Sequence, residues 1–126
     1  MITLSNGIRV ANFSSPHPFV FQDGSKLNGL TPEKSSQLEL IVVENDESDG
    51  DVSLDFILSD SAIAELNYWL DVHQQDKVDR VIIPYPLMMA MKQAGWTKQQ
   101  IKASPFRVVR MTDRIKKLAA IDKWCI

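Results

Sequence analysis

A short loop near the start of the sequence has the chemistry to bind an anion. Ser14, Ser15 and His17 offer two hydroxyl groups and an imidazole, and Pro16 and Pro18 restrict the backbone that carries them. A stiff loop loses little conformational freedom on binding, and its backbone amides add donors for anion oxygens. The alternative is that the two prolines only turn the chain. We predict that the loop belongs to a site for a phosphate-bearing ligand.

The cations for such a site come from the other end of the chain, where basic residues are frequent and acids are rare. A guanidinium group matches phosphate oxygens with two parallel hydrogen bonds. Arg107 and Arg110 are three residues apart, so on one strand they point to opposite faces, and one of them needs a partner on the covered side. The alternative is a solvated basic face that pairs with the acidic N-terminal half. The predicted ligand-binding residues are Ser14, Ser15, His17, Arg107, Arg110 and Arg114.

No catalytic motif stands out. The single cysteine, Cys125, can form neither a disulfide within the chain nor a thiolate zinc site. Nucleophile-elbow, P-loop and dinucleotide-binding glycine patterns are missing. The acidic segment 44–51 lacks the spacing of a calcium loop and is interpreted as a solvated hairpin loop. We predict no catalytic residue, no metal and no cofactor; an enzyme with an unrecognised site stays open as an alternative.

The composition is typical of one globular domain over residues 1–126, with 44% hydrophobic and 24% charged residues. The formal net charge of −2 argues against general DNA binding, which needs many contacts to phosphate. The basic C-terminal segment still leaves a nucleic-acid-associated accessory role as an alternative. No signal-peptide pattern and no apolar run of the ~20 residues that span a membrane are present, so we expect a cytoplasmic protein without membrane contact.

Apolar periodicity predicts mainly strands in the first half. The pair Asn6-Gly7 predicts a β-hairpin turn, because both residues tolerate a positive φ. Thr31-Pro32 is a helix start, although only a short, weak helix fits before the next strand. Residues 38–43 are rich in branched side chains and predict a buried strand, antiparallel to the strand that follows. The predicted strands are 2–4, 8–13, 19–21, 38–43 and 52–58.

The second half predicts helices alternating with strands. Ser59 is a helix cap, and Ile63, Leu66 and Leu70 form one apolar stripe behind it. Segment 113–126 has helical spacing, and the choice between helix and strand stays open there. The predicted helices are 60–75, 86–94 and a short turn at 97–101; the predicted strands are 81–83 and 106–111. Together these elements predict an α+β fold, with a mostly antiparallel sheet of five to seven strands and two main helices packed on it.

The apolar run 84–91 contains Met88, Met89 and Met91, and methionine suits both core gaps and partner surfaces. If the helix turns Met89 outward, the run can contact a second copy. We predict at least a dimer, with plain core packing of the run as the alternative.

Two blocks of the sequence resemble small uncharacterised phage proteins: residues 10–18, with their Ser-Ser-Pro-His turn, and residues 108–114 followed by 122–125. The resemblance implies a phage origin, a β-rich tail and a place in the cytoplasm of the host. It also implies a small non-catalytic protein that binds a host protein or a small anionic ligand, such as a nucleotide, as an antagonist of host defence.

Overall fold

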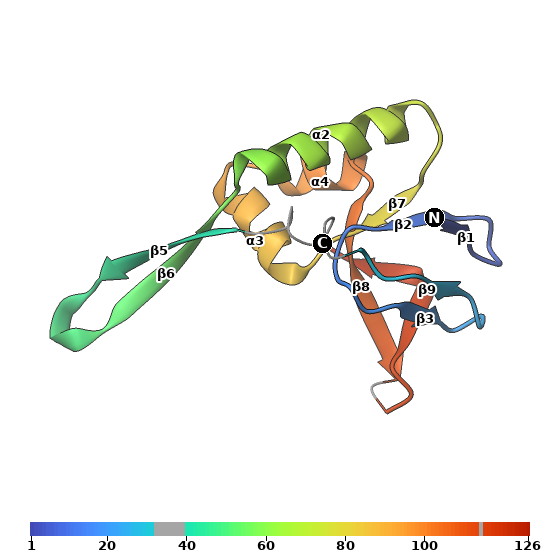
Figure 1. Ribbon diagram of the computed structural model, residues 1–126, viewed down its shortest axis with the longest axis horizontal. Coiled ribbons are helices and arrows are strands. Elements are labelled where there is room, and N and C mark those ends of the chain that lie inside the picture. Colours follow the sequence, from blue (N-terminus) through green and yellow to red (C-terminus); the bar gives the residue numbers. More distant parts are fainter. Residues whose placement is uncertain (32–39, 114) are drawn as a thin grey trace.

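The computed structural model describes residues 1–31, 40–113 and 115–126 (Figure 1). Seven strands form one sheet in the order β1-β2-β7-β8-β9-β3-β4. These strands are β1 (Ile2–Thr3), β2 (Arg9–Asn12), β3 (Phe19–Phe21), β4 (Lys26–Leu27), β7 (Arg80–Ile82), β8 (Phe106–Asp113) and β9 (Leu118–Cys125). Two further strands, β5 (Ile41–Asp46) and β6 (Val52–Ile57), pair only with each other and are joined by the short helix η1 (Ser48–Gly50). The α+β class is therefore confirmed.

The sheet is mixed. Strands β2, β7 and β8 run parallel to one another, and α3 (Tyr85–Gln93) and α4 (Lys98–Ala103) form the connection between β7 and β8. Strand β9 runs antiparallel to β8 and parallel to β3. Among the described strand pairs four are antiparallel and three are parallel, so the expected antiparallel character is only partly present.

Two apolar clusters hold the fold together. One lies between the sheet and the helices, where Leu66 of α2 (Asp60–Gln74) packs with residues of α3, α4, β7 and β8. The other is formed by side chains of the sheet strands alone and their loops, where Val10 of β2 packs with Phe21 of β3 and Leu27 of β4. The sheet curls enough for β2 to contact β4, and Asn6 Nδ2 donates to Ile121 O at 3.0 Å. None of the described helices is long and apolar enough to cross a membrane.

Local signals predicted many of these elements correctly. The N-terminal hairpin forms around Gly7, whose φ is 86°. The Ser59 hydroxyl accepts the Ala62 N–H at 3.1 Å and starts α2, and the capping box at the start of α4 is complete. Within segment 113–126, left open between helix and strand, residues 118–125 form β9. The two-residue strand β4 follows the turn at residues 22–25 and was not expected. The helix expected after Thr31 lies outside the described residues.

Two predictions of burial are wrong. Of the strand expected to be buried at 38–43, residues 41–43 belong to β5 and are exposed, because β5 leaves the main sheet and pairs only with β6; residues 38 and 39 lie outside the described residues. Ile63, placed on the buried stripe of α2, is 42% exposed, whereas Leu66 is buried and Leu70 half-buried. Ile63 lies in the first turn of the helix, where no layer of the sheet reaches it. Met88 and Met91 of the apolar run are core residues.

Candidate functional site

The predicted anion loop is held by its own hydrogen bonds. The Asn12 side chain accepts the Ser14 N–H at 2.8 Å and donates to the carbonyl oxygens of Ser15 and Asn28 at 3.3 and 3.1 Å. The Ser15 hydroxyl accepts the His17 N–H at 3.3 Å. The stiffness of the loop, which the prolines indicated, thus has a structural role, because it fixes the chain between β2 and β3.

Arg107 is the arginine on the covered side. Its guanidinium Nη1 donates to the carbonyl oxygens of Ile101, Ser104 and Phe106 at 2.8, 3.0 and 2.7 Å, and Nη2 donates to Lys102 O at 3.0 Å. Three of these carbonyl groups belong to the last turn and the C-cap of α4, where helix carbonyls lack the next turn as a partner, and Ile101 O also accepts the Ser104 hydroxyl at 2.6 Å. Burial lowers the pKa of Arg107 to about 10, and the charge of Arg80 adds to this effect. Arg107 therefore serves the fold, and few of its donors remain for a ligand.

The other predicted residues are only partly brought together. Ser14 lines a cavity of about 230 Å³ together with Val109 and Met111, the two neighbours of Arg110 on β8. Arg110 is exposed and is not itself part of the cavity wall. Arg114 lies outside the described residues. The loop and β8 are thus close in space, but among the described residues no side chain that carries a full charge lines this cavity.

The most exposed apolar surface of the molecule was not predicted. Strands β5 and β6 form a two-stranded arm, residues 41–57, that extends away from the body (Figure 1). Six large apolar side chains on it are between 36% and 55% exposed. They are Ile41, Val42, Val43, Val52, Leu54 and Ile57. Isolated two-stranded hairpins have little stability in water, and exposed apolar surface of this extent typically marks an interface.

Both faces of the arm are apolar near its base. Directly paired residues share a face, so Val42, Leu54 and Phe56 lie on one side and Ile41 and Ile57 on the other. The outer edge of β5 makes no strand pair with any described residue, whereas β6 contacts α3. Both faces and one edge of the arm are therefore open to a partner.

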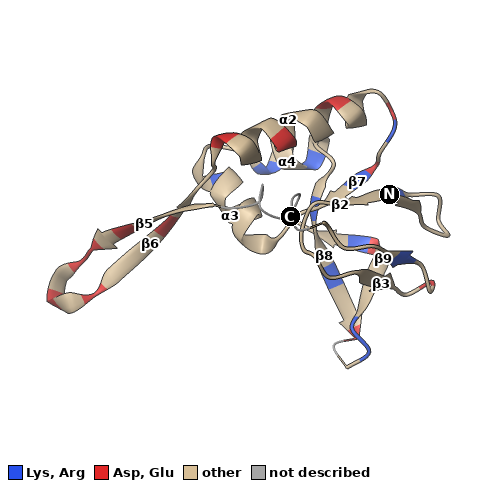
Figure 2. Cartoon of the chain, viewed as in Figure 1, with Lys and Arg blue, Asp and Glu red and all other residues tan. Residues whose placement is uncertain are grey.

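The arm is also the acidic pole of the chain. It carries six acidic side chains and no basic one, and the rest of the chain carries all fourteen basic side chains against ten acidic ones. Figure 2 shows acids and no basic residue along the arm, and basic residues spread over the rest of the molecule, including α4 and β8. The six acids are Glu44, Asp46, Glu47, Asp49, Asp51 and Asp55. None of them forms an ion pair within the described part of the chain.

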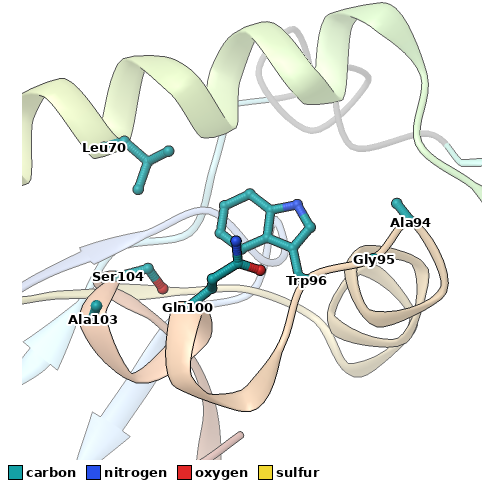
Figure 3. A pocket seen from close by; sticks show the side chains of 7 residues that line it. All are labelled: Leu70, Ala94, Gly95, Trp96, Gln100, Ala103 and Ser104. Carbon is teal, nitrogen blue, oxygen red and sulfur yellow. The ribbon is translucent and has the colours of Figure 1, made fainter.

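Two larger cavities lie beside the helices. One, of about 530 Å³, is at the base of the arm, where Phe56, Ile57 and Ile63 meet Ala90 and Ala94. The other, of about 480 Å³, lies between α2 and α4, and Leu70, Trp96 and Gln100 point into it (Figure 3). The Gln100 Oε1 already accepts the Thr97 N–H at 2.8 Å. The second cavity has no ionisable side chain in its wall, so it is suited to an apolar group and not to acid–base chemistry.

The strongly shifted carboxylates have structural roles. Asp79 accepts hydrogen bonds from Arg9, which lower its pKa to about 2. Asp23 accepts the backbone N–H of Ser5, and this bond lowers its pKa to about 2. His73, near the end of α2, has its Nδ1 at 2.9 Å from the carbonyl oxygen of Val78, which follows the helix. Over residues 1–31, 40–113 and 115–126, no group of three or more potential metal ligands comes together.

The open arm, with its apolar faces and acidic side chains, is thus the surface of the described chain with the clearest capacity to bind another molecule. Comparison with known proteins gave no matching family model, no matching curated protein and no matching solved structure.

Proposed function

We propose that this chain is a non-catalytic binding protein that contacts a partner protein through the arm. The observation that carries the proposal is the exposure of apolar side chains on both faces of a hairpin that the described residues cover only where the base of β6 contacts α3. Burying such side chains at an interface releases roughly 25 cal/mol for each Å² of apolar surface removed from water. The same burial would stabilise the hairpin itself.

The charge of the arm defines the kind of partner. Five of the six carboxylates lie in segment 44–51, toward the tip of the arm, and the apolar side chains are densest at its base, so a partner needs an apolar patch bordered by lysine or arginine. This pattern excludes nucleic acid as the occupant of the arm, because a phosphate backbone would be repelled. The resemblance to small phage proteins adds the proposal that such a partner belongs to the bacterial host.

Site-specific photo-cross-linking in bacterial cells tests this proposal. A photoreactive benzoylphenylalanine replaces Leu54 on the arm in one variant and Tyr68 on α2 in the other; these side chains are 48% and 55% exposed. We expect a protein adduct from position 54 and little from position 68. The adduct is identified by mass spectrometry and then purified for binding measurements.

The affinity of arm variants for that purified partner then shows whether the apolar side chains of the arm make the contact. We expect V42D with V52D to weaken the affinity by about tenfold or more, because charges replace central apolar contacts. The matched control, N45D with S53D, adds the same charge to polar positions of the same two strands and should change the affinity by less than about threefold. Equal adducts from positions 54 and 68, or equal effects of the two pairs of substitutions, would reject the proposal.

A further inference from the structure

Strand β8 continues beyond its neighbour. β7 pairs with β8 only at Val81↔Phe106 and Ile82↔Arg107, and the last backbone contact is the Ile83 N–H donating to Arg107 O at 2.9 Å. Pro84 then turns the chain into α3. Residues 108–113 of β8 pair with β9 on one side, but no described strand pairs with them on the other. We call this segment the free edge of β8; an open edge of this kind is a template for an added strand.

A cavity lies where β7 would continue along this edge. Ile83, Pro84 and Tyr85 bound it at the end of β7, and Val109 and Met111 bound it on β8; its volume is about 230 Å³. In strand addition, backbone hydrogen bonds provide the affinity, and pockets accept alternate side chains of the added strand. The free edge of β8 therefore has both a backbone template and an adjacent apolar pocket.

The surroundings of the free edge are basic. Arg110 on β8, Lys116 and Lys117 in the following turn, and Lys123 on β9 are all exposed. None of these four makes an ion pair with a described residue. Two acids lie among them: Asp113, which accepts the backbone N–H groups of Ile115 and Lys116, and Asp122 on β9. The six acids of the arm lie at the far side of the same molecule (Figure 2).

We propose that the arm of a second copy of this chain adds to the free edge of β8 through the outer edge of β5. This inference rests on the proposed function of the arm and adds a second copy of this chain to the partners that the arm binds. Strand β5 has six residues, which matches the length of the free edge, and its acids Glu44 and Asp46 face a basic surface. Pairing of two arms with each other is disfavoured, because each would bring six negative charges.

The contact joins two different surfaces, so a dimer closes only when the contact is made in both directions; made in one direction, it gives rings or filaments. A reciprocal exchange of arms between two copies gives a closed dimer, in which each main sheet gains strand β5 of the other copy. The arm then has no open edge, and apolar side chains of β5 can be buried in the cavity beside β8.

Charge reversal tests the pairing. The arm-reversed variant carries E44K, D46K and D55K, and the edge-reversed variant carries R110E, K116E and K117E. The control variant carries K92E, K98E and K102E on α3 and α4, which is the same change of charge as in the edge-reversed variant. Circular dichroism and thermal melting establish that each variant is folded.

Light scattering then gives the mass of each variant, where a monomer is 14.3 kDa. We expect the wild type and the control to be dimers at micromolar concentration and both reversed variants to be monomers. A mixture of the two reversed variants should form a heterodimer, because each again meets an opposite charge. A wild-type monomer, dimers of either reversed variant, or a mixture that fails to associate would overturn the proposal.

Hydrogen exchange shows whether the contact is strand addition. In the heterodimer we expect slower amide exchange in residues 41–46 of one chain and 108–113 of the other, compared with each variant alone. Association without this protection would contradict the pairing of β5 with β8. A monomeric wild type whose arm still gives adducts with another protein would reject this inference alone; a monomer without arm adducts would reject the proposed function as well.

Discussion

Arg9 is tied to Asp79 by its backbone and its side chain: the Asp79 carboxylate oxygen Oδ2 accepts the Arg9 N–H at 2.8 Å and the Arg9 Nε–H at 2.9 Å. A third bond joins Arg9 Nη2 to Asp79 Oδ1 at 2.9 Å. The pair connects β2 to the residue that precedes β7, so it stabilises the parallel pairing of these two strands.

This pair predicts a dependence of stability on pH. The hydrogen bonds from Arg9 lower the pKa of Asp79 from its usual value near 3.8 to about 2 in the folded chain. A lowered pKa means that the ionised carboxylate stabilises the fold above about pH 4, and that this contribution is lost as the pH falls from about 4 to about 2. We expect D79N to be less stable than the wild type at pH 7 and the difference to shrink below pH 4, as measured by urea unfolding. The control D71N, at an exposed position of α2, should show no such trend. A difference for D79N that stays constant with pH would contradict the prediction.

The two apolar residues of α2 provide a test of the core. L66A removes a side chain that is 2% exposed and should lower the free energy of unfolding by about 2–5 kcal/mol. I63A removes an exposed side chain of the same helix and should cost less than about 1 kcal/mol. Urea melts of both variants measure the difference, and similar losses would mean that α2 packs with a different face.

Substitutions of Arg107 and Arg110 provide a second test with a matched control. R107A removes a charged donor from four carbonyl oxygens near the end of α4, and we expect the free energy of unfolding to fall by roughly 2–3 kcal/mol, because bonds to charged donors are strong. Of the four carbonyls, Ile101 O keeps its bonds from Ser104. R110A removes an exposed side chain and should leave the stability within about 0.5 kcal/mol of the wild type. Equal stability of the two variants would show that the carbonyls find other partners.

The sequence predicted the locally specified elements and left the non-local ones open. Asn6-Gly7, the Ser59 cap and the capping box at Thr97 act within a few residues, so their structures follow from neighbouring side chains. In β9 the helical spacing is overridden by pairing with β8 and with β3, which is about a hundred residues away.

The same limit applies to the candidate sites. Alternation along the strand correctly required one of Arg107 and Arg110 to have a partner, but it could not identify which of them. The branched residues of β5 are equally typical of a central strand and of an uncovered one, since burial is decided by layers contributed from elsewhere in the chain. The only local sign of the exposed arm was the set of six acids around it.

The predicted phosphate site can be tested on the residues whose side chains remain available, His17 and Arg110. We expect nucleotides and cyclic nucleotides to include a ligand that raises the melting temperature, since a ligand at 100 times its Kd adds about 2.7 kcal/mol of stability. H17A and R110A should each weaken binding, with a coupling above about 0.5 kcal/mol in a double-mutant cycle if both touch the ligand. The control K98A should bind normally; an additive effect of H17A and R110A, or none, would reject a shared site.

General DNA binding is expected to be absent. The net charge is −2, and the arm presents six acids that repel a phosphate backbone. A gel-shift assay with random duplex at about 1 µM protein and physiological salt should therefore show no complex. A shift that weakens steeply with added salt would mean that the basic residues around β8 and β9 bind phosphates despite the acidic arm.

The place of β9 between β8 and β3 has a consequence for synthesis on the ribosome. Strands β3 and β4 emerge early, but in the main sheet β3 is joined only through β9, which is made almost last. Strands of two or three residues do not persist alone, so Phe21 and Leu27 stay exposed to chaperones until residues 118–125 are released. Three of the seven strands, β9, β3 and β4, therefore join the sheet after translation of β9, and a premature stop before Leu118 would leave β3 permanently without its neighbour.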